Sequence, residues 1–139
     1  MFILDTNVLS AMMSAKPVPQ VAAWVARQDI ELLFTVAVCQ AEILSGLAIM
    51  PKGRRRQILE QAARTMFLED FDGRVLPFDL AAAVVYAEIF AARRLAGRPI
   101  ATVDLMIAAV ARTHGASVVT RDGGGFDDCG LTVIDPWAA

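Results

Sequence analysis

Short apolar runs alternate along this chain with longer segments whose apolar residues recur at helical spacing. Five runs have the length and composition of buried strands: 2–4, 32–34, 74–76, 117–120 and 131–134. The segments between them predict helices from about Asn7 and over about 18–28, 35–50, 54–67, 80–96 and 102–114. Because strands alternating with helices are typical of a parallel sheet covered on both faces, we predict a doubly wound, three-layer α/β/α fold with about five strands.

Single residues set several of the predicted helix boundaries. Thr35, Asp79 and Thr102 stand where an N-cap is expected, directly before or at the start of a helical pattern. Pro51 and Gly97 follow the last residues of two helical patterns, where such residues commonly end a helix. His114 and Gly115 end the last predicted helix in the same way, which favours a structural role for His114 at the helix dipole.

Length and composition limit the class of protein. The 139 residues fit one domain, 1–139, and a hydrophobic share of 56% supplies a packed core. The net charge of −2 gives no global argument for nucleic acid, so binding of a polyanion would need a local basic patch or a bound metal ion. Cys39 and Cys129 have neither zinc-site spacing nor the number of a disulfide scaffold. With no signal peptide or membrane span in the pattern, we expect a cytoplasmic protein.

Four carboxylates are predicted to meet at one edge of the sheet. Asp5 directly follows the first strand, and Asp122 follows the strand at 117–120, so both belong at the carboxyl edge where ligands of open parallel sheets bind. Asp104 lies in the first turn of its helix on the stripe that faces the core, and Glu42 is surrounded at helical spacing by apolar or small residues. An ionised Glu42 on such a face is costly unless it is compensated.

A hard divalent cation would compensate such a cluster. Carboxylates that converge repel one another and raise each other's pKa, whereas Mg²⁺ or Mn²⁺ prefers oxygen ligands and negative charge. Such an ion can activate water and stabilise charge on a phosphate during hydrolysis. Each acid taken alone also has an ordinary interpretation. Asp104 would complement a helix dipole, Asp5 and Asp122 would be turn or cap residues, and Glu42 would pair with an arginine.

The motifs around these acids resemble those of PIN-domain proteins, most of all the VapC and FitB-type toxins of bacterial toxin–antitoxin pairs. Four motifs carry the resemblance in the right order: LDTNVLS at Asp5, AEILSGL at Glu42, GRPIATVDLMIAAVARTHGA at Asp104 and VVTRD at Asp122. The resemblance spans nearly the whole chain. It implies a PIN fold, endoribonuclease activity dependent on Mg²⁺ or Mn²⁺, and a homodimer. It also implies an antitoxin that blocks the site and carries any contact with DNA, and it maps the family's acidic quartet onto these four residues.

One motif departs from the family pattern. Members often carry T-R-N-x-x-D-F, where this chain has Thr120-Arg121-Asp122 followed by three glycines and Phe126. Gly125 therefore replaces the usual Asp, and Asp122 is expected to serve as the fourth acid, with Asp127 as a weaker alternative. The three glycines suggest a mobile loop, and the number of metal ions, one or two, stays open.

Several other residues have both a structural and a functional interpretation. Thr6 and Thr120 would either cap turns or support the neighbouring acids by hydrogen bonding. Two basic groups, Lys52 with Arg54–Arg56 and Arg93–Arg94 with Arg98, would be solvated faces or contacts to the RNA backbone, with Arg98 as the named RNA-contact candidate. The helix at 80–96 is apolar on more than one side, which favours a homodimer.

Two other functions are compatible with parts of this pattern. An aspartate-nucleophile phosphatase would suit Asp5 at the end of the first strand, but such enzymes usually carry a second Asp two residues on, where this chain has Asn7. A non-catalytic subunit of a DNA-binding repressor complex would suit a degenerate site, whereas four acids are present here. Metal-dependent RNA cleavage that is lost on mutating Asp5 would separate the nuclease from both alternatives.

Overall fold

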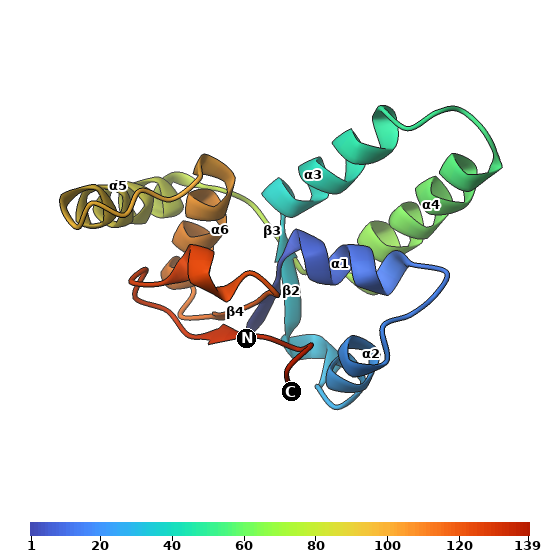
Figure 1. Ribbon diagram of the computed structural model, residues 1–139, viewed down its shortest axis with the longest axis horizontal. Coiled ribbons are helices and arrows are strands. Elements are labelled where there is room, and N and C mark those ends of the chain that lie inside the picture. The colour runs from blue at the N-terminus through green and yellow to red at the C-terminus, as the bar shows by residue number, and fades with distance from the viewer.

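The computed structural model describes residues 1–139 and has a five-stranded sheet at its centre (Figure 1). The strands are β1 (Phe2–Leu4), β2 (Leu33–Val36), β3 (Val75–Leu76), β4 (Ser117–Val119) and β5 (Val133–Ile134). Their order is β3-β2-β1-β4-β5, and every neighbouring pair is parallel, with Ile3 aligned to Phe34 on one side and to Val118 on the other. This topology confirms the predicted parallel sheet of about five strands.

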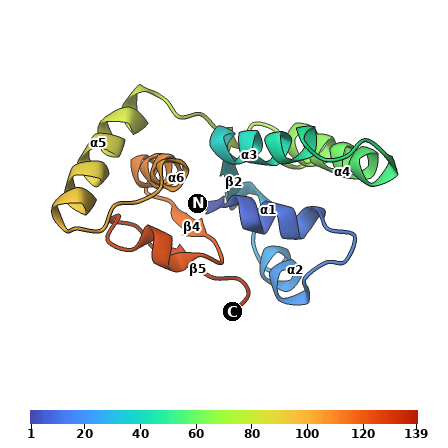
Figure 2. The ribbon, with the colours of Figure 1, turned by 45° about the horizontal axis from the view of Figure 1, so that its top comes forward.

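Six α-helices surround the sheet: α1 (Thr6–Met13), α2 (Pro19–Ala26), α3 (Ala37–Ala48), α4 (Arg54–Thr65), α5 (Leu80–Leu95) and α6 (Thr102–Thr113). Figures 1 and 2 show α5 and α6 together on one side of the sheet and α1, α2 and α4 on the other, which is the predicted α/β/α layering. No helix combines the length and the apolar character that crossing a membrane requires.

The core lies between the sheet and the inner faces of α1, α3 and α6. Ile3 and Leu4 of the central strand are fully buried, as are Ile107 and Ala108 of α6. A strand buried on both faces lacks the alternation of a half-exposed strand, which is why β1 is a continuous apolar run. Burial of both faces leaves the carboxyl edge as the place where polar side chains can gather.

Several predicted boundaries are confirmed and others are wrong. Asp79 caps α5 by accepting from the backbone N–H of Ala82 at 3.0 Å, and Gly97 follows the helix with φ 71°. Thr35 does not cap α3, because β2 continues to Val36 and the Thr35 hydroxyl instead donates to the carbonyl of Leu4 at 2.9 Å.

Other elements also start or end differently. Thr102 is the first residue of α6 rather than its cap, and Ala101 in the cap position offers no side-chain acceptor. The third strand begins at Val75 and the last at Val133, later than predicted. Beyond α4, the segment Met66–Asp70 winds as a π-helix, and its first two residues, Met66 and Phe67, are buried in the core.

Candidate active site

Asp5 is held where β1 passes into α1, and only 6% of it is exposed. Its backbone N–H donates to the carbonyl of Val119 at 2.9 Å, which extends the hydrogen bonding between β1 and β4 by one residue. One carboxylate oxygen accepts from the backbone N–H of Thr6 at 2.7 Å and so caps α1, and the other accepts from the hydroxyl of Thr120 at 2.8 Å. The carboxylate therefore has a fixed position at the edge of the sheet.

Thr120 is fully buried, and its hydroxyl joins three segments at the site. While donating to Asp5, it accepts from the Asn7 side-chain amide at 3.0 Å and from the backbone N–H of Asp122 at 3.1 Å. Asn7 in turn accepts from the backbone N–H of Arg121 at 3.3 Å. The sequence-based prediction missed Asn7 as a member of the site; its place in the first turn of α1, two residues after Asp5, was the available signal.

Glu42 approaches the site from α3. Its carboxylate accepts from the hydroxyl of Thr6 at 2.6 Å, so Thr6 contacts both Asp5 and Glu42. The expectation that Glu42 would lie on a costly apolar face is wrong, because its side chain is exposed. The face of α3 that packs into the core is instead formed by Cys39, Ile43 and Leu47.

Asp104 and Asp122 complete the cluster beside Gly125. Asp104 lies in the first turn of α6, and Asp122 directly precedes the short 3₁₀ helix Gly123–Phe126. A Cβ added to Gly125 would lie 3.5 Å from a carboxylate oxygen of Asp104 and 3.6 Å from one of Asp122, so these two acids flank the glycine. The glycines form a 3₁₀ turn that ends at Phe126, which is 1% exposed and packs in the core.

The pKa shifts show that the four carboxylates act on one another. Burial raises the pKa of Asp104 to about 6, and the charges of Asp5, Asp122 and Glu42 contribute in the same direction. Burial also raises the pKa of Asp5; the hydrogen bonds from Thr120 and Thr6 oppose this, and the charges of Glu42 and Asp122 add to it. The structure thus brings the four predicted acids into one electrostatic cluster whose full ionisation is unfavourable without a compensating cation.

The donor atoms of this cluster fit a hard divalent cation. Ligand atoms of Asp5, Glu42 and Cys39 lie within 4.8 Å of one another. Burial raises the pKa of Cys39 to about 12, so at neutral pH its thiol is protonated and lies 3.9 Å from a carboxylate oxygen of Asp5 as a weak donor. The remaining donors are carboxylate oxygens, the ligands that Mg²⁺ and Mn²⁺ prefer. Both cysteines are free and buried.

Asp127, the alternative fourth acid, lies away from the cluster. Its carboxylate is 3.5 Å from the guanidinium of Arg98, which also pairs with Asp128 at 2.6 Å. The neighbouring charges that raise the pKa values of Asp5 and Asp104 do not include Asp127. The position next to the other acids therefore belongs to Asp122. Arg98, the named RNA-contact candidate, has its charge engaged by these two carboxylates.

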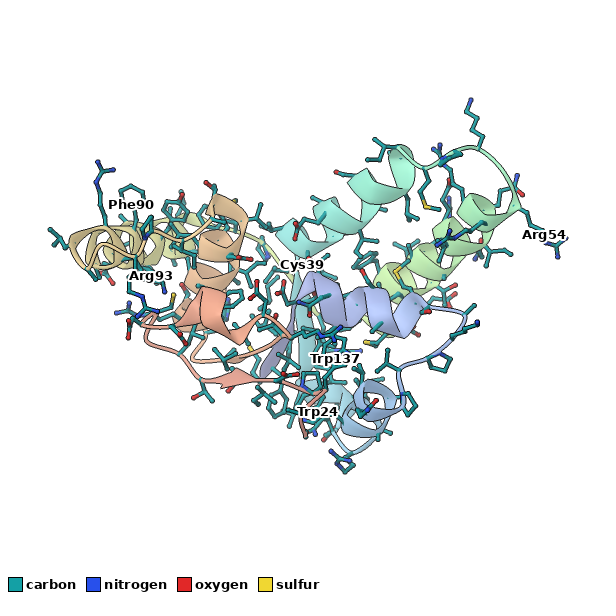
Figure 3. All side chains as sticks on the ribbon, in the orientation of Figure 1. Trp24, Cys39, Arg54, Phe90, Arg93 and Trp137 are labelled. Atoms are coloured by element: carbon teal, nitrogen blue, oxygen red, sulfur yellow. The ribbon has the colours of Figure 1, made fainter.

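Arg93 is not part of a solvated basic face, contrary to the prediction that grouped it with Arg94 and Arg98. It is 5% exposed and points from α5 toward the C-terminal loop (Figure 3). Its guanidinium donates to the backbone carbonyls of Arg98, at 2.5 Å, and Asp127. These hydrogen bonds compensate the buried charge and connect α5 to the segment after the 3₁₀ turn. The contact with Asp127 is distant in the chain, so the local sequence does not reveal it.

Comparison with known proteins agrees with this geometry. Residues 2–130 match the PIN domain family. The chain is 44% identical to the VapC ribonuclease Y4jK of Sinorhizobium fredii over 137 residues, covering 99% of this chain and 98% of that protein. It is 36% identical over 137 residues to the Toxin FitB of Neisseria gonorrhoeae, covering 99% of each. A solved structure of FitAB bound to an IR36 DNA fragment superposes with a TM-score of 0.92 at 36% identity, covering 99% of this chain and 96% of that one.

Proposed function

The chain belongs to the PIN-domain family, and from that membership we propose that it is the ribonuclease toxin of a toxin–antitoxin pair. It would hydrolyse phosphodiester bonds within RNA in the cytoplasm, in a reaction that depends on Mg²⁺ or Mn²⁺. One observation carries the proposal: Asp5, Glu42, Asp104 and Asp122 form a single carboxylate cluster at the carboxyl edge of the sheet. The names of the relatives support the same conclusion.

The buried and the exposed carboxylates would contribute differently to binding of a cation. Asp5 and Asp104, whose pKa values burial raises, gain most from a neighbouring positive charge, while the exposed Glu42 and Asp122 complete the set on the solvent side. When bound, the ion would lower the pKa of a water molecule and offset negative charge on the phosphate. Thr6 and Thr120 keep the carboxylates in position by hydrogen bonding.

The surroundings of Asp5 argue against a phosphatase that uses an aspartate nucleophile. Such an enzyme needs a proton donor for the leaving group, supplied in that class by an acid two residues further on. In this chain the residue is Asn7, and both ends of its amide are occupied by Thr120 and by the backbone N–H of Arg121. A metal-dependent nuclease requires no proton donor at that position.

An antitoxin would inhibit by covering the acid cluster. An arginine suits this task, because its guanidinium forms paired hydrogen bonds with carboxylates and would take the place of the cation. FitAB is bound to an IR36 DNA fragment in a solved structure. We propose that this protein contacts DNA only indirectly, through its antitoxin. We further propose a homodimer formed through α5, where Leu80 and Leu95 are each 89% exposed.

The test is cleavage of a mixed RNA pool by the purified protein, with and without Mn²⁺ or Mg²⁺, followed by mapping of the cut ends. Asp5→Asn should abolish cleavage and keep the fold, because it retains the shape of the side chain and removes the charge. The matched control is Asp72→Asn, which neutralises an exposed carboxylate in the turn before β3. Full cleavage by a folded Asp5→Asn protein would contradict the proposal. So would a wild-type protein that cleaves RNA at the same rate with and without EDTA.

A further inference from the structure

A groove of about 410 Å³ begins at the acid cluster and continues between α1, α3 and the start of α4. Thr6 and Glu42 line one end, and Arg55 lines the other. The groove is also lined by apolar side chains from the three helices and from the turn after α3: Met13, Ile43, Leu47, Met50 and Leu59. Figure 1 shows these helices gathered on one side of the sheet, with the turn between α3 and α4 projecting away from it.

The two ends of the groove carry opposite charge. The turn between α3 and α4 bears Lys52, and the first turn of α4 bears Arg54, Arg55 and Arg56. The chain has no acidic residue between Glu42 and Glu60. Arg56 is engaged by Glu60 at 2.5 Å, whereas Arg55 is exposed and has no carboxylate within ion-pair distance. Arg54 projects from the same turn at the periphery of the molecule and does not line the groove (Figure 3).

Gly46 lines this groove in the last turn of α3, where glycine is a poorer helix former than alanine, by at most about 1 kcal/mol. The fold does not require it. Its φ is not positive, and a Cβ added at this position would meet no atom within 4 Å. The absence of a side chain therefore keeps the space outside the helix open, because a bulky residue at this position would project into the groove.

We propose that this groove holds the single-stranded RNA on one side of the scissile bond, with Arg55 binding a backbone phosphate. The inference rests on the proposed ribonuclease function and identifies the path of its substrate. The groove offers the groups that bind single-stranded RNA. The Arg55 guanidinium would bind a phosphate, the apolar side chains would contact bases, and the Ser10 hydroxyl would bind a sugar. The order of charges fits one strand with one phosphate at the metal site and another at Arg55.

The first experiment measures binding separately from cleavage. In an Asp5→Asn background, a fluorescein-labelled single-stranded oligoribonucleotide is titrated with protein in Mn²⁺ at several salt concentrations. Arg55→Gln should raise Kd about tenfold, as for the loss of one charge-assisted contact, and should reduce the salt slope by about 0.7. Arg54→Gln removes the same charge one residue away and should change Kd far less. In the active protein, Arg55→Gln should raise KM and leave kcat unchanged.

The second experiment fills the groove. Gly46→Trp should weaken RNA binding at least as much as Arg55→Gln, and Gly46→Ala, the control for helix stability, should bind RNA nearly as the parent protein does. A wild-type Kd for RNA in both Arg55→Gln and folded Gly46→Trp would overturn the inference. A Gly46→Trp protein that binds RNA as the wild type does and fails only to bind its antitoxin would also overturn it. Should Gly46→Trp not fold, Arg55→Gln against Arg54→Gln decides. A wild-type protein that cuts no RNA would instead overturn the proposed function.

Discussion

Replacing Asp104 by Asn should stabilise the metal-free protein at neutral pH and at the same time remove a group needed for activity. Burial and three neighbouring carboxylates raise the pKa of Asp104 from 3.8 to about 6 in the folded protein. The folded state therefore binds the proton more tightly than the unfolded state, and stability is lost as the pH rises from about 4 to about 6. Above that range the ionised carboxylate destabilises the fold, and an amide does not.

The size of the effect follows from the shift. The roughly two pKa units correspond to about 3 kcal/mol, at about 1.4 kcal/mol per unit, and this is an upper limit. Asp104 is partly exposed, so solvent screening reduces the value. Asn also loses the favourable interaction of a carboxylate with the N-terminus of α6, about 0.3–1 kcal/mol. We expect a net gain of about 1 kcal/mol, or a rise in Tm of about 3–5 °C for a domain of this size.

Thermal and urea unfolding in EDTA at pH 7.5 and pH 4.5 measure this gain. The advantage of Asp104→Asn should shrink at pH 4.5, where the wild-type carboxyl is largely protonated in the folded state. Saturating Mn²⁺ should reverse the order, because only the wild-type site gains binding free energy from the ion. Asp72→Asn serves as the control and should stay within about 0.5 kcal/mol of wild type. An Asp104→Asn protein that is less stable than wild type in EDTA at pH 7.5 would refute the electrostatic reasoning.

Three further predictions concern the same site and the assembly. Cleavage at subsaturating Mn²⁺ should fall as the pH drops through about 6, because protons compete with the ion for the Asp104 carboxylate. Higher Mn²⁺ should move the midpoint of the pH–rate profile to lower pH, and a midpoint independent of Mn²⁺ would contradict this. Asp122→Ala should raise the Mn²⁺ concentration required for cleavage, though less than Asp104→Ala does, whereas Asp127→Ala should leave it unchanged; the opposite order in Mn²⁺ titrations would transfer the fourth role to Asp127. Sedimentation at micromolar concentration should show a dimer, and Val84→Glu on the exposed face of α5 should yield monomers; a monomeric wild-type protein would count against the interface.

The sequence carried enough information to place the acids at one edge because parallel strands impose a common direction. Asp5 and Asp122 each follow an apolar run, and pairing of β1 with β4 sets the ends of those runs side by side. Asp104 was placed by helical periodicity, since α6 buries one stripe against the sheet. The boundaries of α5 followed from Asp79 and Gly97, whose effect on the backbone is local.

Long-range contacts account for what the sequence did not reveal. Thr35 has the chemistry of a cap, but its hydroxyl finds the carbonyl of Leu4 on the neighbouring strand. Arg93 belongs by composition to a basic surface, and only the folded loop brings the carbonyl of Asp127 to it. In both cases the polar group has a partner distant in the chain, which neither propensity nor periodicity encodes.

The direction from which a substrate reaches the cluster follows from how its members are held. Asp5 is held at the end of β1 by hydrogen bonds to Thr120 and to the backbone of β4. The sheet therefore closes the cluster on the side of Asp5. Glu42 and Asp122 are exposed; Glu42 lies midway along α3, and Asp122 directly precedes the 3₁₀ turn. The cluster is therefore open to solvent on the side of these two side chains. Because Glu42 also lines the groove that leads to Arg55, the opening of the site and the proposed path of the RNA are continuous. A nucleic acid strand, which extends in both directions from the bond that is cut, is the kind of substrate that such an open edge accommodates.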